Sequence, residues 1–171
     1  MKKNISQKCK KIKLVLTDVD GVLTDGGRYF TKNGESMKKF HTRDGMGVNI
    51  LLRNGIKTGI VTKENSQITK KWSKEMNVTK TFSGVIRKEM ELPKICQIFN
   101  LNACEIAYIG DDVNDIELIK KVGLSAVPND GINQVKKQSD YVCKLNGGEG
   151  AFREFSDLIL SKKFPKKIQW Y

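Results

Sequence analysis

Apolar and polar positions alternate along the chain in blocks that predict a repeated order of strand and helix. Short runs rich in Val, Ile and Leu predict buried strands, and blocks with apolar residues three or four apart predict helices with one buried face. The predicted strands span residues 12–17, 56–62, 79–83, 105–109, 124–127 and 140–143. The predicted helices span residues 44–53, 66–76, 88–100, 115–122 and 151–161. This order is typical of a doubly wound α/β fold built on a single, mostly parallel sheet.

One segment departs from this order. Two extended stretches flank Asn33 and Gly34, and Asn-Gly between such stretches is a strong signal for a β-hairpin. We therefore expect residues 27–41 to form a hairpin flap. Only this hairpin lies between Asp25 and Asp44, so the interval leaves no room for a large cap domain.

The length of 171 residues suits one domain with a sizeable core. We predict a single domain over residues 1–171, with flexible tails at residues 1–11 and 163–171. Hydrophobic residues make up 39% of the chain and charged residues 29%, as in ordinary globular proteins. No apolar run reaches the length of a membrane span, and the basic N-terminus lacks the apolar centre of a signal peptide. We therefore expect a cytoplasmic protein without a membrane partner.

The formal net charge of +12 suggests an anionic partner. The lysines are spread over the whole chain without interleaved aromatic residues, which argues against nucleic acid and favours a solvated surface or a small phosphorylated acid. The four cysteines form no C-x-x-C pair, and His41 is the single histidine. A structural zinc site and a Cys-His nucleophile are therefore both disfavoured.

Carboxylates follow two of the predicted strands. Asp18 and Asp20 come directly after the first strand, and Asp111, Asp112 and Asp115 follow a later one. Ligands bind at the carboxyl ends of strands in doubly wound sheets, so the two clusters can converge there. Buried carboxylates are costly without a compensating cation, and Mg²⁺ prefers oxygen ligands. The two clusters together therefore indicate a magnesium site rather than a set of helix caps and turn residues.

Four motifs resemble those of the haloacid dehalogenase superfamily. Asp18-Val-Asp-Gly-Val-Leu-Thr24 resembles the first motif, and Thr62 stands where the family has its second-motif Ser or Thr. Lys88 resembles the third-motif lysine, and Gly110-Asp-Asp-Val-Asn-Asp115 resembles the fourth motif. The motifs occur in the family's order and cover nearly the whole chain. The resemblance implies a Mg²⁺-dependent phosphatase that forms an aspartyl-phosphate intermediate.

The resemblance also implies a role for each motif residue. Asp18 would attack phosphorus, and Asp20 would protonate the leaving oxygen and then activate water. Lys88 would offset negative charge on the phosphate and on Asp18, while Thr62 and Lys63 would bind phosphate oxygens.

The same resemblance implies the ligands of the ion. Mg²⁺ would be held by Asp18, by the carbonyl of Asp20 and by Asp111, with Asp112 and Asp115 in support.

Within the superfamily, the nearest pattern is that of the 3-deoxy-D-manno-octulosonate 8-phosphate phosphatases. The shared segments are residues 18–26, 40–45 and 147–154. This resemblance implies a phosphorylated 3-deoxy-2-ulosonic acid as substrate and a homotetramer in which hairpins of neighbouring subunits complete the site. The candidates for contact with the substrate are Arg43, Gly45, Glu64 and Arg153.

Two departures from this group leave the substrate open. The octulosonate enzymes usually have Gly-Arg after the second-motif threonine, and often Gly-Gly-Arg-Gly near the end. This chain has Lys63-Glu64 at the first place and Glu149 at the second. Lys63-Glu64-Asn-Ser66 is closer to a branch that acts on 2-keto-3-deoxynononate or sialate 9-phosphate, where Glu64 would accept hydrogen bonds from sugar hydroxyls. In the alternative interpretation, Glu64 does not contact substrate and only stabilises the start of the following helix.

Other functions on the same scaffold also stay open. A phosphatase for nucleotides, phosphoserine or a polynucleotide end would share all four motifs. A non-catalytic regulatory domain would be expected to lose motif residues, whereas this chain keeps Asp18, Asp20, Lys88 and Asp111.

Overall fold

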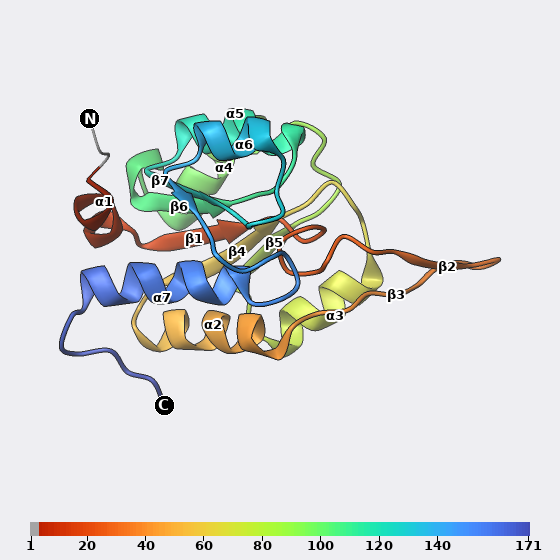
Figure 1. Cartoon of the computed structure of the whole chain (residues 1–171), viewed down its shortest axis with the longest axis horizontal. Coiled ribbons are helices and arrows are strands. Elements are labelled where there is room, and N and C mark those ends of the chain that lie inside the picture. Colours follow the sequence, from red (N-terminus) through yellow and green to blue (C-terminus); the bar gives the residue numbers. More distant parts are fainter. Residues whose placement is uncertain (1–3) are drawn as a thin grey trace.

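A six-stranded parallel sheet forms the centre of the computed structural model, which describes residues 4–171 (Figure 1). The strand order is β5-β4-β1-β6-β7-β8. The strands are β1 (Leu14–Thr17), β4 (Lys57–Val61), β5 (Lys80–Phe82), β6 (Ile106–Ile109), β7 (Leu124–Val127) and β8 (Tyr141–Val142). All four residues of β1 are buried, and this strand pairs with β4 on one side and β6 on the other. The prediction of a doubly wound, mostly parallel sheet is confirmed.

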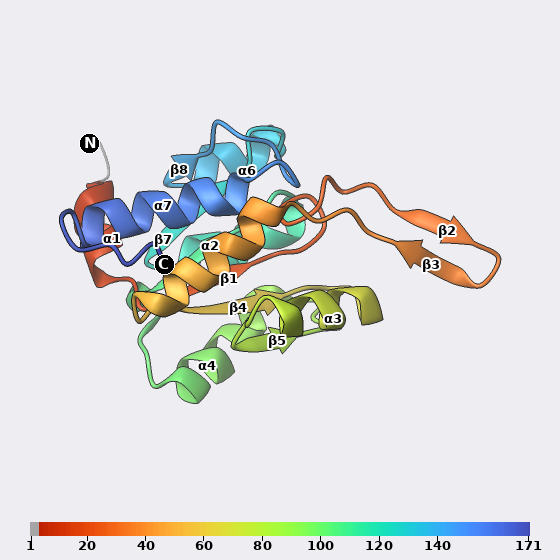
Figure 2. The ribbon, with the colours of Figure 1, turned by 90° about the horizontal axis from the view of Figure 1, so that it is seen from below.

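Helices cover both faces of the sheet (Figures 1 and 2). One face carries α1 (Ile5–Lys11), α2 (Thr42–Arg53), α3 (Gln67–Glu75) and α7 (Ala151–Lys163). The other face carries α4 (Lys88–Phe99), α5 (Ile116–Lys121) and α6 (Asn133–Gln138). Short 3₁₀ turns are η1 (Ala103–Glu105) and η2 (Val113–Asp115). A separate cluster of buried apolar side chains fills each side of the sheet. Across residues 4–171, none of the helices combines the length and the apolar character needed to cross a bilayer.

The hairpin is formed by β2 (Tyr29–Thr31) and β3 (Gly34–Met37) and projects from the body of the molecule (Figure 2). Gly34 has a φ of +104°, a conformation that other residues rarely adopt. Tyr29, Phe30 and Met37 are 49%, 61% and 53% exposed. Between Asp25 and Asp44 the chain forms this hairpin and no cap domain, as predicted.

The prediction of a flexible tail over residues 1–11 is wrong for its described part; residues 1–3 lie outside the described residues. Asn4 caps α1, and Cys9 is fully buried where α1 packs against α7. Lys8 forms an ion pair with Asp140 at 2.6 Å. Burial of the apolar side of α1 offsets the entropy lost when this lysine-rich segment is ordered.

The predicted C-terminal tail is also ordered. Lys163 still belongs to α7, and the residues after it turn back along α2 (Figure 1). The side chain of Asn54 exchanges two hydrogen bonds of 3.0 Å with the backbone of Gln169. Arg53 donates to the carbonyl of Trp170 at 2.9 Å. These polar contacts, together with Ile168 packed on the core, hold the segment against the helix.

Candidate active site

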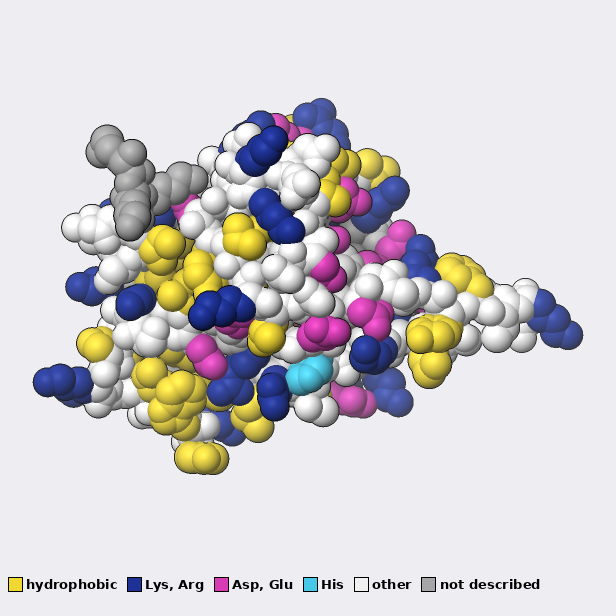
Figure 3. Space-filling view, in the orientation of Figure 1, with side chains coloured by type: hydrophobic (Ala, Val, Ile, Leu, Met, Phe, Trp, Pro, Cys, Tyr) yellow, Lys and Arg dark blue, Asp and Glu magenta, His cyan; other side chains and the backbone are white. Residues whose placement is uncertain are grey.

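A cavity of about 520 Å³ lies at the carboxyl ends of the central strands. Its lining combines acidic, basic and hydroxyl side chains: Asp18, Asp20, Arg28, Thr62, Lys63, Glu64, Ile86, Asp111, Asp112, Val113 and Asn114. Figure 3 shows acidic side chains gathered where the hairpin leaves the body, whereas Lys and Arg are spread over this face of the molecule. An anionic ligand entering the cavity would meet both cations and carboxylates. Its binding therefore depends on how the negative charge of the carboxylates is neutralised.

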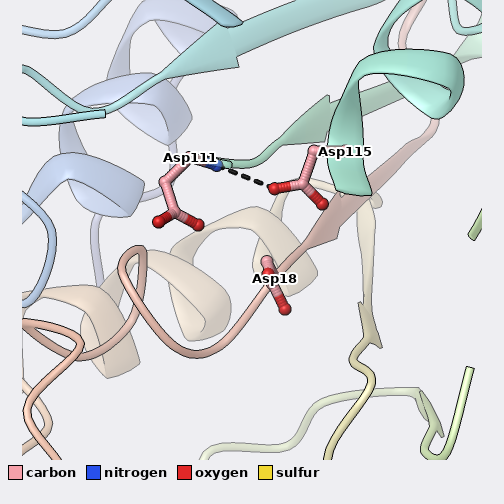
Figure 4. Close-up of side chains that lie close together, drawn as sticks. All are labelled: Asp18, Asp111 and Asp115. Carbon is pink, nitrogen blue, oxygen red and sulfur yellow. Dashed lines mark hydrogen bonds between the residues drawn. The ribbon is translucent and has the colours of Figure 1, made fainter. Parts of the chain in front are cut away.

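Three aspartates meet at the floor of the site (Figure 4). Asp18 follows β1, Asp111 follows β6 by two residues, and Asp115 ends η2. Ligand oxygens of the three carboxylates lie within 4.8 Å of one another. Asp18 is 6% exposed and Asp115 is fully buried. The two acidic clusters of the sequence therefore converge, because β1 and β6 are neighbours in the sheet.

Lys88 supplies a buried positive charge to this cluster. Its Nζ lies 2.6 Å from Asp18 Oδ2 and 2.7 Å from Asp115 Oδ1, and it donates to the hydroxyl of Tyr108 at 3.2 Å. Although burial alone lowers the pKa of Lys88, the charges of Asp18 and Asp115 outweigh it and raise that pKa. The lysine therefore stays charged and offsets one of the three carboxylates.

The remaining carboxylates are short of positive charge. Burial, together with repulsion from Asp18 and Asp115, raises the pKa of Asp111 to about 8. Burial raises the pKa of Asp18 to about 6, even though Lys88 acts in the opposite direction. Asp111 Oδ1 is buried and has no hydrogen-bond partner among the described residues. A hard divalent cation fits this arrangement, because it would pair with that oxygen and relieve the repulsion.

Both oxygens of the Asp115 carboxylate accept hydrogen bonds within the site. Its Oδ1 accepts hydrogen bonds from Lys88 and from Tyr108, the latter at 2.5 Å. Its Oδ2 accepts from the backbone N–H groups of Asp111 and Asp112 at 2.9 and 3.2 Å. Both oxygens are thus engaged in orienting the loop that carries Asp111.

The predicted acid and base, Asp20, lines the cavity with 24% of its side chain exposed. Its Oδ1 is paired with Lys38, whose side chain is fully buried at the base of the hairpin. Lys38 is not among the site residues predicted from the sequence, because it lies among several lysines in a segment that reads as a surface flap. Arg28, also from the hairpin, lines the cavity and was missed for the same reason.

The second-motif residues also line the cavity. Thr62 follows β4, and its hydroxyl accepts a hydrogen bond from the N–H of Glu64 at 3.3 Å. Lys63 and Glu64 both line the cavity, and Arg28 Nη2 lies 3.3 Å from Glu64 Oε2. Glu64 precedes Ser66, the N-cap of α3, so it is not part of the first helical turn.

Three predicted substrate contacts do not line the cavity of a single chain. Arg43 is exposed on the first turn of α2. Gly45 is buried, and a Cβ there would lie 2.3 Å from Met76 Sδ, so it serves close packing of α2 on α3. Arg153 pairs with Asp157 at 2.8 Å and lies over the ring of Trp170. Their contact with substrate stays a prediction.

The glycine-rich segment before α7 packs against the loop after β1. A Cβ at Gly147 would lie 2.0 Å from the carbonyl oxygen of Gly21, so only glycine permits this approach. Gly148 donates to the carbonyl of Val22 at 3.0 Å. Asp44 from α2 accepts from the N–H of Arg153 at 2.8 Å and so caps α7 from outside that helix. The shared segments 40–45 and 147–154 thus brace the loop that carries Asp18 and Asp20.

Comparison with known proteins agrees with this geometry. A family model described as haloacid dehalogenase-like hydrolase matches residues 54–154. The 3-deoxy-D-manno-octulosonate 8-phosphate phosphatase of Haemophilus influenzae is 38% identical over 164 residues, which cover 96% of this chain and 91% of that protein. The cobalt-bound structure of the Haemophilus enzyme superposes with a TM-score of 0.90 at 38% identity, over 92% of both chains.

A second solved structure is the 3-deoxy-D-manno-octulosonate 8-phosphate phosphatase of Moraxella catarrhalis, in complex with magnesium ion, phosphate ion and the octulosonate. It superposes with a TM-score of 0.90 at 33% identity and covers 93% of this chain and 91% of its own. By fold, site and sequence, this chain belongs to the haloacid dehalogenase-like hydrolases, in the family of 3-deoxy-D-manno-octulosonate 8-phosphate phosphatases.

Proposed function

We propose that this chain is a Mg²⁺-dependent phosphatase that hydrolyses 3-deoxy-D-manno-octulosonate 8-phosphate. The observation that carries the proposal is the buried cluster of Asp18, Asp111 and Asp115, in which Lys88 offsets only part of the charge. Such a cluster suits a divalent ion and a phosphate together. The relatives from Haemophilus and Moraxella are both named as phosphatases of this substrate.

In this proposal the reaction has two displacements. A carboxylate oxygen of Asp18 attacks phosphorus, the P–O bond to the sugar breaks, and Asp20 gives a proton to the leaving oxygen. Asp20 then takes a proton from a water that attacks the aspartyl phosphate, which releases phosphate and restores Asp18. Thr62 and Lys63 hold phosphate oxygens, and Lys88 offsets charge on Asp18 and on the phosphate.

The ion would be held by Asp18, Asp111 and the carbonyl of Asp20, with Asp112 and Asp115 in support. When bound, Mg²⁺ supplies charge neutralisation during phosphoryl transfer. Asp111 Oδ1, which has no hydrogen-bond partner in the described part of the chain, supports this assignment, because a buried carboxylate oxygen without a partner is costly.

A nine-carbon acid phosphate is a second candidate, favoured by the position of Glu64. This carboxylate lines the cavity and is held by Arg28, which supports a role in contact with substrate over one in starting α3. Glu64 could accept hydrogen bonds from the additional hydroxyl groups of 2-keto-3-deoxynononate or sialate 9-phosphate. Because Lys63 is assigned to the phosphate, Arg28 is the other cation of the cavity lining that could bind the carboxylate of either acid.

Parallel measurement of kcat/KM for octulosonate 8-phosphate, nononate 9-phosphate and sialate 9-phosphate tests the proposal. We expect the octulosonate ester to be the best substrate of the three with Mg²⁺ present. Replacing Glu64 with Arg should raise the kcat/KM ratio of the eight-carbon to the nine-carbon esters by about tenfold, as for loss of one polar contact. A higher kcat/KM for a nine-carbon ester in the parent enzyme would favour the second candidate, and failure to hydrolyse any of the three would contradict both.

The acidic cluster predicts that Mg²⁺ stabilises the protein more at pH 8 than at pH 6. Folding raises the pKa of Asp111 to about 8 and of Asp18 to about 6, from an ordinary value of 3.8. The proton-linked stability of the ion-free protein is therefore complete below pH 3.8 and is lost as the pH rises through these values. Protons also compete with the ion for the same oxygens.

Thermal unfolding in EDTA and in Mg²⁺ at both pH values checks this expectation. The midpoint in EDTA should fall from pH 6 to pH 8, and Mg²⁺ should restore it. In Asp111→Asn, both the fall and the response to Mg²⁺ should be reduced. An equal response to Mg²⁺ at the two pH values in the parent protein would show that these carboxylates do not form the ion site.

We also propose that the protein is a homotetramer located in the cytoplasm. The exposed apolar side chains of the hairpin, Tyr29, Phe30 and Met37, support a surface that a second copy of the chain covers. Nucleic acid and membranes are not among the partners that we propose.

A further inference from the structure

We propose that Lys38 is a positioning residue for Asp20, so that the hairpin takes part in catalysis by fixing the carboxylate that exchanges protons with substrate and water. This inference rests on the acid and base role proposed for Asp20. It concerns a lysine outside the four motifs, in the flap that replaces a cap domain.

Burial is the first observation that supports this role. The Lys38 side chain is fully buried, and its ammonium group contacts Asp20 Oδ1 and, at 3.3 Å, Glu35 Oε1. The next residue, Lys39, instead has a side chain that is 56% exposed and pairs with Asp25 at 3.1 Å. Burying an ammonium group is costly unless carboxylates compensate it, so Lys38 is stable at this position only as a partner of these acids.

The base of the hairpin determines where Lys38 lies. Phe40 forms an isolated antiparallel bridge with Thr24, in the loop that carries Asp20. The ring of Phe40 is stacked on Trp72 of α3 with centroids 4.7 Å apart. Figures 1 and 2 show the hairpin leaving the body at the end of the sheet where β1 ends. The backbone bridge and the ring packing of Phe40 therefore hold the segment that carries Lys38.

Glu35 connects this pair to the rim of the cavity. It accepts from the hydroxyl of Ser66, the N-cap of α3, at 2.8 Å and from Arg28 Nε at 3.0 Å. Arg28 in turn donates to Glu64 at 3.3 Å. A continuous set of ion pairs and hydrogen bonds thus runs from Asp20 through the hairpin to the residues that face the substrate.

The consequence for Asp20 is that one oxygen is fixed and the other is left for chemistry. Oδ1 receives both the Lys38 ammonium group and the hydroxyl of Thr24 at 3.5 Å. No hydrogen bond among residues 4–171 goes to Oδ2, and the side chain lines the cavity. A carboxyl group anchored through one oxygen keeps its second oxygen aimed at the leaving group, and misplacement by about 1 Å can cost about 10²-fold in rate.

Leaving-group dependence in Lys38→Met distinguishes positioning of Asp20 from a general structural role. The parameter kcat/KM reports the steps up to the first displacement, where Asp20 protonates an alkoxide of the sugar. The p-nitrophenolate group of p-nitrophenyl phosphate leaves without needing a proton. In Lys38→Met we therefore expect kcat/KM for the sugar-acid phosphate to fall by about 10²-fold, while kcat/KM for p-nitrophenyl phosphate changes little.

The same variant should show a second sign of the defect. Hydrolysis of the aspartyl phosphate also needs Asp20, so p-nitrophenol should be released in a rapid burst followed by a slower steady rate. Lys38→Arg, which keeps the charge, should recover part of the lost kcat/KM. Lys39→Met is the matched control, since it removes a neighbouring exposed lysine. In this variant kcat/KM for both substrates should be unchanged.

Equal losses on both substrates, or no loss on the sugar-acid phosphate, would overturn the role of Lys38. If Lys38→Met does not fold, Lys38→Arg and Glu35→Gln provide the test. In these variants, too, kcat/KM should fall more for the sugar-acid phosphate than for p-nitrophenyl phosphate if Lys38 positions Asp20. Asp20→Asn separates the two proposals, because it should show the same leaving-group pattern more strongly. Equal losses on both substrates in Asp20→Asn would instead show that the proposed role of Asp20 is wrong.

Discussion

Replacing Asp18 with asparagine should lower the turnover of the sugar-acid phosphate by at least about 10⁴-fold, the scale seen when a nucleophile is removed from an enzyme. An amide is a poor nucleophile and cannot form the aspartyl phosphate. The side chain keeps its size, and its oxygen can still accept the N–H of Val19, which is 2.7 Å from Asp18 Oδ1. Loss of activity should therefore occur without loss of the fold.

Acid-quenched mass spectrometry and thermal unfolding test these two statements together. The parent enzyme should carry a phosphoryl group during turnover, and the variant should carry none. Because the substitution removes one negative charge from a crowded acidic cluster, the ion-free variant should be at least as stable as the parent. Asp25→Asn is the matched control, since Asp25 lies in the same loop and, within residues 4–171, pairs only with Lys39 and the backbone. Near-normal turnover in the Asp18 variant would contradict the covalent mechanism.

Replacing Lys88 with methionine should lower both activity and stability. The change leaves Asp18 and Asp115 as buried carboxylates without their cation, a loss that costs about 3–5 kcal/mol in comparable buried pairs. Tyr108 also loses the ammonium group that donates to its hydroxyl. Turnover should fall as well, because negative charge on Asp18 and the phosphate is no longer offset.

Denaturant unfolding with and without Mg²⁺ measures the loss of stability. Lys94→Met is the matched control within α4: Lys94 pairs with Glu91 at 2.6 Å, but its side chain is 64% exposed. Removing an exposed pair should change the free energy of unfolding far less than removing Lys88. A Lys88→Met protein as stable as the control variant would show that the buried cluster does not depend on this lysine.

Local sequence patterns were sufficient to predict the sheet and the aspartate cluster. The apolar run of β1 ends directly at Asp18, and the run of β6 ends just before Asp111, so the position of both acids follows from strand endings. Parallel pairing of β1 with β6 then brings the acids together. The order of elements and their type depend on hydrophobic periodicity, which the chain carries locally.

The missed parts of the structure depend on contacts between distant residues. Lys38 is buried next to the place where Phe40 bridges Thr24, a contact between distant residues, whereas the sequence near Lys38 reads as an exposed flap. α1 is ordered by packing on α7, which lies at the other end of the chain. Motif resemblance also selects Gly45 without revealing that it permits the close packing of α2 against Met76 at the end of α3.

The central position of β1 has a consequence for folding during synthesis. β1 ends at Thr17, but its partner β6 begins only at Ile106, and Lys88 and Asp115 are likewise made late. On the ribosome, the strand that leads to Asp18 therefore keeps one unpaired edge until about two thirds of the chain has emerged. Unpaired strand edges favour aggregation, and such long-range pairing slows folding. The arrangement that brings distant acids into one site thus makes the nascent N-terminal half dependent on the prompt arrival of the second half.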